Sequence, residues 1–379
     1  MIKIVTVIGA RPQIIKAAAL SRAIKNSFAD KIAEVIVHTG QHYDNNMSQV
    51  FFDELRIPAS NYNLQVGSGS HGIQTAKMIE GIEQILVAEK PHALLVYGDT
   101  NSTLAGAIAA SKLHIPIVHV EAGLRSFNKK MPEEINRILC DHCATLLFSP
   151  TVAGYNNLIN EGFNKNALPP YSNDNAFIVH CGDVMYDNSL FFEAEANRKS
   201  TVLNKINKPY VLVTVHRAEN TDDADALNNL FQAIQNLSLA YQVSFVLPLH
   251  PRTAHLLPKS LTPELYQSIV DNKLIQIIEP VSFLDMIALE SNAKLIVTDS
   301  GGVQKEAYFF KKPCIILRQQ TEWTELVACG SAILAGANIA RIEDAFAYYY
   351  SNDISLQFPP IFGDGHAAEF ICKTIIEKL

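Results

Sequence analysis

Three acidic residues have the type and position needed to move protons on a small substrate. Asp99 stands in YGDT and Glu121 in VEAG, each just after a short apolar run, and Glu133 is the first acid of PEEINR. Carboxyl groups that flank a bound substrate can serve as general acid and general base. Acids at such positions also act as helix N-caps or salt-bridge partners, so for each residue alone the two roles are about equally supported.

A second group of residues could bind a compact anion such as a diphosphate. Arg11, Lys16, His216 and Arg217 all fall at expected strand ends or first helical turns. The Ser-Gly-Gly turn at 300–302 lies between an expected strand and an expected helix, where glycines and free N–H groups favour a phosphate. An isolated turn of this kind is usually only a tight turn with a Ser N-cap. The neighbouring cations favour the diphosphate interpretation.

Two further patterns bear on which ligands the chain could bind. The first expected strand-to-helix turn, Gly9 to Pro12, lacks the GxGxxG fingerprint, which disfavours a dinucleotide cofactor. His216 could be a core histidine, but its place before Arg217 at the end of an apolar strand favours a ligand role.

The elements that must position these residues follow an α/β pattern. Short β-branched runs alternate with helical patterns, which is typical of parallel sheets. The candidate strands are residues 4–8, 35–38, 94–97, 117–120 and 146–148, then 177–180, 211–215, 244–247, 275–278, 295–298 and 314–317. Polar or glycine clusters follow seven of the expected strands, and ligands of open parallel sheets bind beyond the carboxyl ends of the strands. We therefore expect two strand-end surfaces that face each other across a cleft.

The Pro/Asn/Ser-rich stretch at 164–176 is suited to an interdomain linker. We expect an N-terminal Rossmann-like domain at 1–168 and a C-terminal Rossmann-like, nucleotide-binding domain at 175–360. The tail at 365–379 has helical periodicity and could cap either domain.

Bulk properties exclude several classes of protein. The chain has 379 residues, of which 48% are apolar, enough for two cores. The net charge of −7 comes without long single-sign runs, so we expect neither a nucleic-acid nor a membrane partner. The six cysteines lie scattered in apolar stretches, as reduced thiols do, which indicates the cytoplasm. Cys140 and Cys143 form a CxxC with no second pair at zinc spacing, so we expect a structural helix face and no metal.

Six motifs in this order resemble the non-hydrolysing UDP-N-acetylglucosamine 2-epimerases over nearly the whole chain. They are GARPQIIK, GDTNSTLAG, HVEAGLRS, PEEINR, VTVHRAEN and TDSGGVQKEA. The resemblance implies the two-domain fold of B-type glycosyltransferases, with the C-terminal helix returning to the first domain. It also implies a UDP-sugar substrate, no cofactor, a homodimer and a role in making surface polysaccharide precursors.

The resemblance further implies a mechanism and a set of site residues. UDP leaves by anti elimination, a 2-acetamidoglycal stays bound, and UDP adds back while the proton returns to the other face of C2. The implied catalytic residues are Asp99, Glu121, Glu133, His216 and Lys16. The implied substrate-binding residues are Arg11, Arg137, Ser300, Gly301, Gly302 and Glu306. A second, activating UDP-sugar site is implied at Gln41, His42, Lys77 and His250, although Lys77 stands where an Arg is common.

Three departures from the family pattern bear on the sugar. Gln13 stands where many members have Glu, Trp323 replaces part of an Arg-Pro pair, and the loop from Phe127 to Met131 is short. These features resemble a branch that acts on UDP-2,3-diacetamido-2,3-dideoxyglucuronic acid, so that sugar is an alternative substrate. A retaining glycosyltransferase of the same fold and a hydrolysing epimerase are further alternatives.

Overall fold

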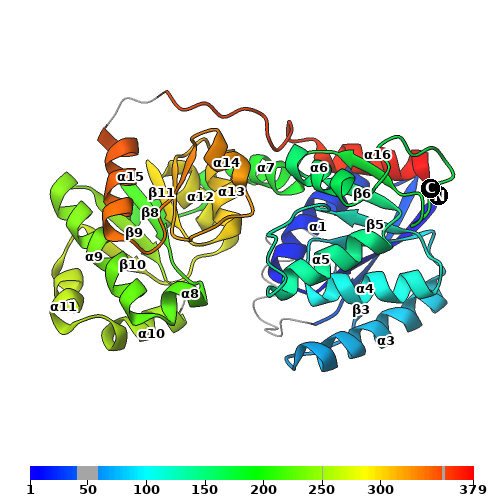
Figure 1. Ribbon diagram of the computed structural model, residues 1–379, viewed down its shortest axis with the longest axis horizontal. Helices are drawn as coiled ribbons and strands as arrows, with labels where there is room; N and C mark the ends of the chain where they lie inside the picture. Colours follow the sequence, from blue (N-terminus) through cyan, green and yellow to red (C-terminus); the bar gives the residue numbers. More distant parts are fainter. Residues whose placement is uncertain (41–58, 250, 352–354) are drawn as a thin grey trace. The chain divides into compact units, whose positions relative to one another are not determined.

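The computed structural model describes residues 1–40, 59–249, 251–351 and 355–379. The chain divides into two compact units, one of residues 1–188 with 360–379 and one of residues 189–359. Each unit is a parallel β-sheet with helices packed on it (Figure 1). The predicted class of two Rossmann-like α/β domains is therefore confirmed.

Among the described residues, unit 1 contains a seven-stranded parallel sheet in the order β3-β2-β1-β4-β5-β6-β7. The strands are β1 (Ile2–Ile8), β2 (Ile32–His38), β3 (Tyr62–Asn63), β4 (Ala93–Tyr97), β5 (Ile117–Val120), β6 (Leu146–Ser149) and β7 (Phe177–His180). The central strands are apolar along their length because helices cover both faces of a parallel sheet. β1 pairs with both β2 and β4, so the strand order reverses there. In open parallel sheets, ligands bind beyond the carboxyl ends of the strands at such a reversal.

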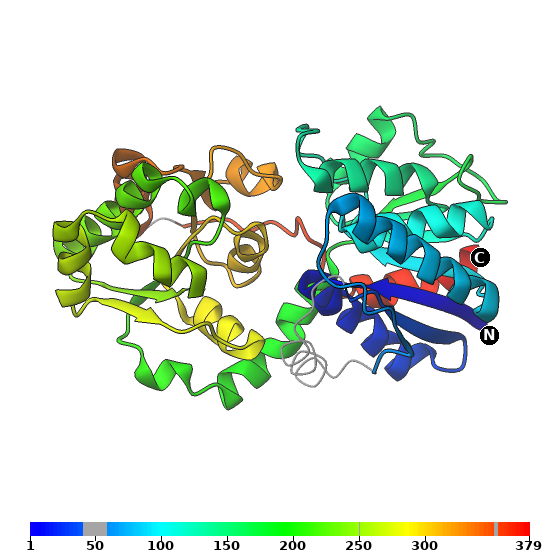
Figure 2. The same cartoon turned by 90° about the horizontal axis from the view of Figure 1, so that it is seen from below.

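The helices of unit 1 lie in two layers. They are α1 (Arg11–Ala23) with the π-helical turn η1 (Ile24–Phe28), α3 (His71–Glu89), α4 (Asn101–Lys112), α5 (Pro132–Cys143), α6 (Val152–Asn160) and α16 (Ala367–Lys378). α3 packs on α4 and α4 packs on α5, whereas α1 packs against α16 (Figure 2). Right-handed crossovers on either side of the β1/β4 reversal account for the two layers.

Unit 2 is built on the same plan in the described part of the chain. Its six-stranded sheet has the order β10-β9-β8-β11-β12-β13, again reversing at a central pair, β8 and β11. The strands are β8 (Tyr210–Thr214), β9 (Ser244–Pro248), β10 (Ile275–Ile278), β11 (Leu295–Thr298), β12 (Cys314–Ile316) and β13 (Ala332–Leu334).

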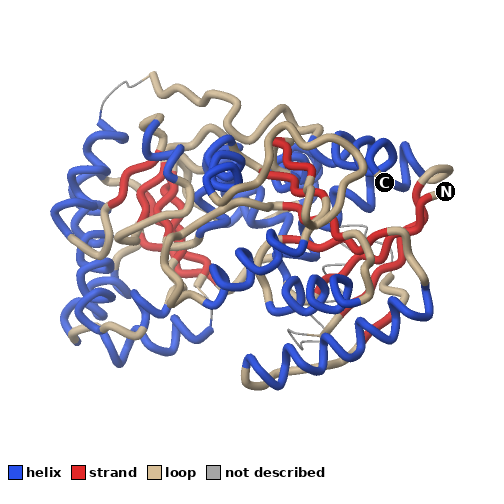
Figure 3. The backbone as a smooth tube through the Cα atoms, turned by 45° about the vertical axis from the view of Figure 1, so that its right-hand side comes forward, coloured by secondary structure: helices blue, strands red, loops and turns tan. Residues whose placement is uncertain are grey.

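The helices of unit 2 surround this sheet (Figure 3). They are η2 (Val202–Lys205), α8 (Ala218–Thr221), α9 (Ala224–Tyr241), α10 (Pro251–Ser260), α11 (Pro263–Asp271), α12 (Phe283–Asn292), α13 (Gly301–Phe309), α14 (Thr324–Ala328) and α15 (Ile339–Ser351). α9 packs against α11 and α15, and Phe231, Phe245 and Phe346 are fully buried in the core that they share.

One predicted boundary is wrong. The run Phe177–His180 was expected to open the second domain after a linker, but β7 pairs in parallel with β6 and is the last strand of the first sheet. The stretch at 164–176 therefore connects α6 to β7 within unit 1, and the division falls inside α7 (Val184–Lys199), between Asn188 and Ser189. A four-residue apolar run looks the same whichever sheet it joins, so its pattern cannot assign it.

The C-terminal helix α16 lies in unit 1, against α1. The backbone N–H groups of Ala367 and Ala368 donate to the carboxylate of Asp187, at 3.2 and 2.7 Å. The side chain of Asn188 in turn donates to the carbonyl of Ile15 at 2.5 Å. Residues far apart in the sequence thus anchor the end of the chain beside the helix that carries Lys16.

Candidate active site

The two strand-order reversals bring most of the predicted residues to two places. In unit 1, Lys16 comes from the helix after β1, Asp99 follows β4 and Glu121 follows β5. In unit 2, His216 follows β8 and the 300–302 turn follows β11. The first place, at the carboxyl ends of β1, β4 and β5, is called the β1/β4 edge, and the second, at the carboxyl ends of β8 and β11, is called the β8/β11 edge.

At the β1/β4 edge, Lys16 and Glu121 form a nearly buried ion pair. The ammonium nitrogen lies 2.7 Å from the carboxylate, and the two side chains are 10% and 9% exposed. Glu121 has a φ of +73°, a left-handed conformation that costs a non-glycine residue free energy. Gly98 beside them makes room, because a Cβ there would lie 3.0 Å from the Lys16 nitrogen. The carboxylate of Glu121 is thus paired with a cation although the backbone of this residue is strained.

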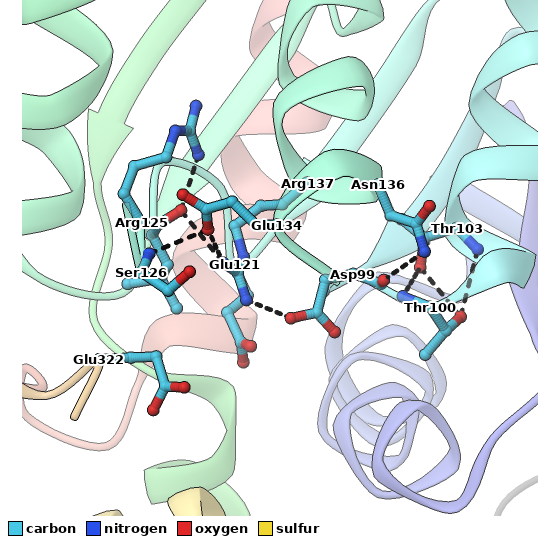
Figure 4. Close-up of polar contacts among 12 residues, drawn as sticks. Asp99, Thr100, Thr103, Glu121, Arg125, Ser126, Glu134, Asn136, Arg137 and Glu322 are labelled. Carbon is cyan, nitrogen blue, oxygen red and sulfur yellow. Dashed lines mark hydrogen bonds and ion pairs between the residues drawn. The ribbon is translucent and has the colours of Figure 1, made fainter. Parts of the chain in front are cut away.

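Arg137 on α5 connects two more carboxylates at the same edge. Its guanidinium pairs with Asp99 and, at 2.9 Å, with Glu134 (Figure 4). Burial alone would lower the pKa of Arg137, but the surrounding carboxylates, first Asp99 and then Glu121, outweigh it and raise the pKa. The amide of Asn136 also donates to the backbone carbonyl of Asp99 at 2.9 Å. α5 therefore fixes Asp99 through both its side chain and its backbone.

The two acids of PEEINR have different environments. Glu133 is exposed in the first turn of α5. Glu134 is 1% exposed, pairs with Arg137 and accepts the backbone N–H groups of Ser126 and Phe127 at 2.9 and 3.0 Å. Sequence reasoning missed Glu134, although its i,i+3 spacing from Arg137 was a usable signal. Glu134 holds the loop before α5, whereas the side chain of Glu133 is exposed.

The side chain of Gln13 is buried beneath the turn that joins β1 to α1. Its side-chain oxygen accepts the N–H groups of Gly9 and Ala10 at 2.9 and 3.2 Å. Its amide nitrogen donates to the carbonyl of Tyr97 at 3.1 Å and to Thr103 at 2.9 Å. A glutamine can accept and donate at once, whereas an ionised glutamate can only accept. Gln13 therefore joins the β1 turn to the end of β4, and the exposed Arg11 begins the helix that follows.

At the β8/β11 edge, one buried carboxylate organises the backbone. Asp299 accepts the N–H groups of His216 at 3.1 Å and Arg217 at 3.0 Å, and the amide of Asn220 at 3.0 Å. Burial would raise the pKa of Asp299, but hydrogen bonds from the side chains of His216 and then Asn220, together with the Arg217 N–H, outweigh it and lower the pKa. The His216 side chain lies 3.2 Å from Asp299 and is 49% exposed. His216 is therefore not a core histidine.

The glycine turn after Asp299 is open. A Cβ on Gly302 would meet only the Ser300 hydroxyl, at 3.9 Å, and one on Gly301 would meet nothing closer than 3.7 Å. The indole N–H of Trp323 donates to the carbonyl of Gly301 at 3.0 Å. The ammonium of Lys305 lies 4.4 Å from the centre of the Trp323 ring. Trp323 thus braces the turn through this hydrogen bond, which no sequence motif indicated.

The remaining predicted residues are less informative. Glu306 is partly buried on α13, within two turns of the helix start. Gln41, His42 and His250 lie outside the described residues, and Lys77 is exposed on α3. No group of residues suited to hold a metal ion occurs in the described part of the chain. Among the described helices, none is long and apolar enough to span a membrane.

A family model described as UDP-N-acetylglucosamine 2-epimerase matches residues 25–376. The chain belongs to this family of isomerases. It is 50% identical to UDP-2,3-diacetamido-2,3-dideoxy-D-glucuronate 2-epimerase from Pseudomonas aeruginosa, over 88% of this chain and 88% of that protein. It is 42% identical to UDP-N-acetylglucosamine 2-epimerase from Methanocaldococcus jannaschii, over 98% of each chain.

A crystal structure of the Methanocaldococcus jannaschii UDP-GlcNAc 2-epimerase in complex with UDP-GlcNAc and UDP has a similar fold. It superposes with a TM-score of 0.85 at 40% identity and covers 99% of this chain and 100% of that one. The predicted family resemblance is confirmed.

Proposed function

We propose that this enzyme is a non-hydrolysing 2-epimerase of a UDP-2-acetamido sugar, of the type that interconverts UDP-N-acetylglucosamine and UDP-N-acetylmannosamine. The observation that carries the proposal is the β1/β4 edge. Two carboxylates, Glu121 and Asp99, are each held there by a buried cation, in a member of a family named for its action on a UDP sugar. Inversion at C2 requires proton transfer on both faces of the sugar, which needs more than one protonatable group.

The reaction balances without a redox partner. A base removes the C2 proton while the C1–O bond to UDP breaks, and the products are a bound 2-acetamidoglycal and UDP. In the return step an acid protonates the other face of C2, and a UDP oxygen forms the C1–O bond again. Because the C2 proton is weakly acidic, cleavage of the C1–O bond runs ahead and leaves positive charge on the ring, which nearby carboxylates stabilise.

We assign a role to each site residue from its charge and its position at one of the two edges. Asp99, Glu121 and Glu133 exchange the C2 proton and stabilise the ring cation, and Arg137 positions Asp99. The groups proposed to bind the rest of the substrate are Arg11, Lys16 and His216 at the diphosphate, the 300–302 turn with the α13 N-terminus at the phosphates, and Glu306 at the ribose. We further propose a cytoplasmic homodimer. The six free cysteines support the cytoplasmic location, and light scattering tests the dimer.

A second candidate substrate is UDP-2,3-diacetamido-2,3-dideoxyglucuronic acid. The 50% identity to the Pseudomonas aeruginosa enzyme exceeds the 42% identity to the Methanocaldococcus jannaschii enzyme. Gln13 and Trp323, which departed from the family pattern, both brace turns at the two edges. The chemistry at C2 would be the same for both sugars, and only the groups at C3 and C6 differ.

Proton NMR in D2O tests both candidates. The enzyme is incubated with each UDP sugar and no acceptor, and the C2 proton signal is followed. Loss of the signal with formation of the C2 epimer supports an epimerase, and the faster sugar is the substrate. A glycosyltransferase would leave C2 protonated without an acceptor, and a hydrolysing enzyme would accumulate UDP in step with turnover. Absence of exchange with either sugar would contradict the proposal.

A further inference from the structure

A buried histidine lies directly beneath the loop that carries Asp99. His119 on β5 is 0% exposed. Its Nδ1 lies 2.7 Å from a carboxylate oxygen of Asp141, and its Nε2 lies 2.8 Å from the carbonyl oxygen of Gly98. Both neighbours are acceptors. A neutral imidazole carries one N–H and can satisfy only one of them, so the two hydrogen bonds together require the doubly protonated ring.

Charges around the ring balance this cation. Asp141 on α5 also accepts Arg125 at 2.7 Å and the N–H of Gly123 at 3.1 Å, and Arg125 pairs with Glu161. The four side chains therefore alternate in sign and sum to zero. Cys140, also on α5, is a further titratable side chain that acts on the ring. Burial lowers the pKa of His119, but Cys140 and Asp141 outweigh burial and raise the pKa well above its ordinary value.

Both backbone polar groups of Gly98 form hydrogen bonds with residues of β5. Its N–H donates to the carbonyl of Val120 at 2.9 Å, and its carbonyl accepts from His119. Gly98 precedes Asp99 in the chain and lies against Lys16, the partner of Glu121. The His119 ring therefore contacts the backbone of Gly98, which adjoins Asp99 in the chain and lies beside the Lys16–Glu121 pair.

We infer that His119 is a positioning residue for the epimerisation: a permanently charged imidazolium that clamps the Gly98 carbonyl and so aligns Asp99 with the Lys16–Glu121 pair. It exchanges no proton with substrate. Asp141 keeps the ring charged, and Arg125 keeps Asp141 ionised. The kinetic consequence rests on the proposed function, whereas the charge state of His119 does not.

The first test needs no substrate. The side-chain nitrogens of histidine are labelled with ¹⁵N, and their chemical shifts are followed in the wild-type enzyme from about pH 6 to about pH 9, across which an ordinary histidine loses its charge. His119 should keep imidazolium shifts throughout. A resonance of His119 that titrates in this range, or is neutral throughout, overturns the inference. Substitution of His119 identifies its resonance.

The second test uses His119→Gln and Asp141→Asn, with His114→Gln as the control because His114 is exposed in the turn after α4. His119→Gln should lower kcat for C2 exchange about a hundredfold, the cost of a small misplacement of catalytic groups, with KM and UDP affinity nearly unchanged. Asp141→Asn removes the balancing charge, so its kcat should fall as pH rises through a new ionisation that the wild type lacks.

Wild-type kcat in both variants, or equal loss of UDP binding and kcat, contradicts the positioning role. If His119→Gln does not fold, the pH profile of Asp141→Asn and the wild-type NMR titration decide. A wild-type enzyme without C2 exchange would instead contradict the proposed function and leave the charge-state result standing.

Discussion

The β1/β4 edge and the β8/β11 edge occupy the same place in two sheets of the same plan, yet they are built from different groups. The first is lined by ionised side chains paired with one another, such as Lys16 with Glu121. The second is organised by a single carboxylate, Asp299, that binds backbone N–H groups beside an open glycine turn. The first arrangement is consistent with the proposed proton transfer, and an open turn at a helix start is consistent with the proposed phosphate site. Topology places a site, but the groups at the strand ends decide its chemistry.

Removing the acids of the β1/β4 edge should have the largest effect. Asp99→Asn, Glu121→Gln and Glu133→Gln should each lower C2 deuterium exchange by about 10² to 10⁴-fold, because an amide keeps the shape but transfers no proton. UDP affinity, measured by calorimetry, should stay nearly normal. Glu83→Gln, an exposed change on α3, is the control. If all three variants exchange at the wild-type rate, the edge has no proton chemistry, and if UDP binding and folding fail together, the acids are structural.

The cations proposed at the diphosphate come next. His216→Ala and Arg11→Ala should each lower kcat by about a hundredfold, as expected for a preorganised donor that stabilises developing charge. Because His216 is half exposed, its removal should barely change the melting temperature. Unchanged kinetics in both variants would remove these residues from the site.

The glycine turn offers a test of phosphate binding separate from folding. Gly302→Ala adds a methyl group that meets no protein atom closer than 3.9 Å, and alanine favours helix α13. Thermal stability should therefore hold or rise. UDP affinity should fall about tenfold or more, the worth of a charge-assisted hydrogen bond, because the methyl group would occupy the space of a phosphate. Gly72→Ala on α3, where a Cβ meets nothing within 4 Å, is the control. Normal UDP binding by Gly302→Ala would place the phosphates elsewhere.

The smallest expected effect is an opposite response of the two units to acid. Burial raises the pKa of Asp187 in unit 1 to about 6 from an ordinary 3.8, so its contribution favours folding at low pH and is lost as pH rises between these values. Asp299 in unit 2 has a lowered pKa, so its contribution is present above about pH 4 and is lost as pH falls through the lowered folded value.

Hydrogen exchange measured unit by unit checks this. Asp187→Asn should flatten the decline in the stability of unit 1 between about pH 4 and pH 6, and Asp299→Asn should remove the acid sensitivity of unit 2. Asp174→Asn, at an exposed position, should do neither. Parallel pH responses of the two units would contradict the assigned environments.

The sequence by itself predicted eleven of the thirteen strands in the described residues, all except β3 and β13. Alternation of β-branched runs with helical patterns fixed two parallel sheets, and the motifs placed Asp99, Glu121 and the 300–302 turn at their carboxyl ends. These features are local, because strand and turn preferences depend on residues within a few positions of one another.

Only the tertiary structure decided what those residues contact. Arg137 reaches Asp99 across 38 positions, and His216 reaches Asp299 across 83. The assignment of β7 to the first sheet and the brace formed by Trp323 depend in the same way on segments distant in the chain. Local preference cannot encode such pairings, because the free energy that selects them comes from packing and desolvation once the sheets have formed.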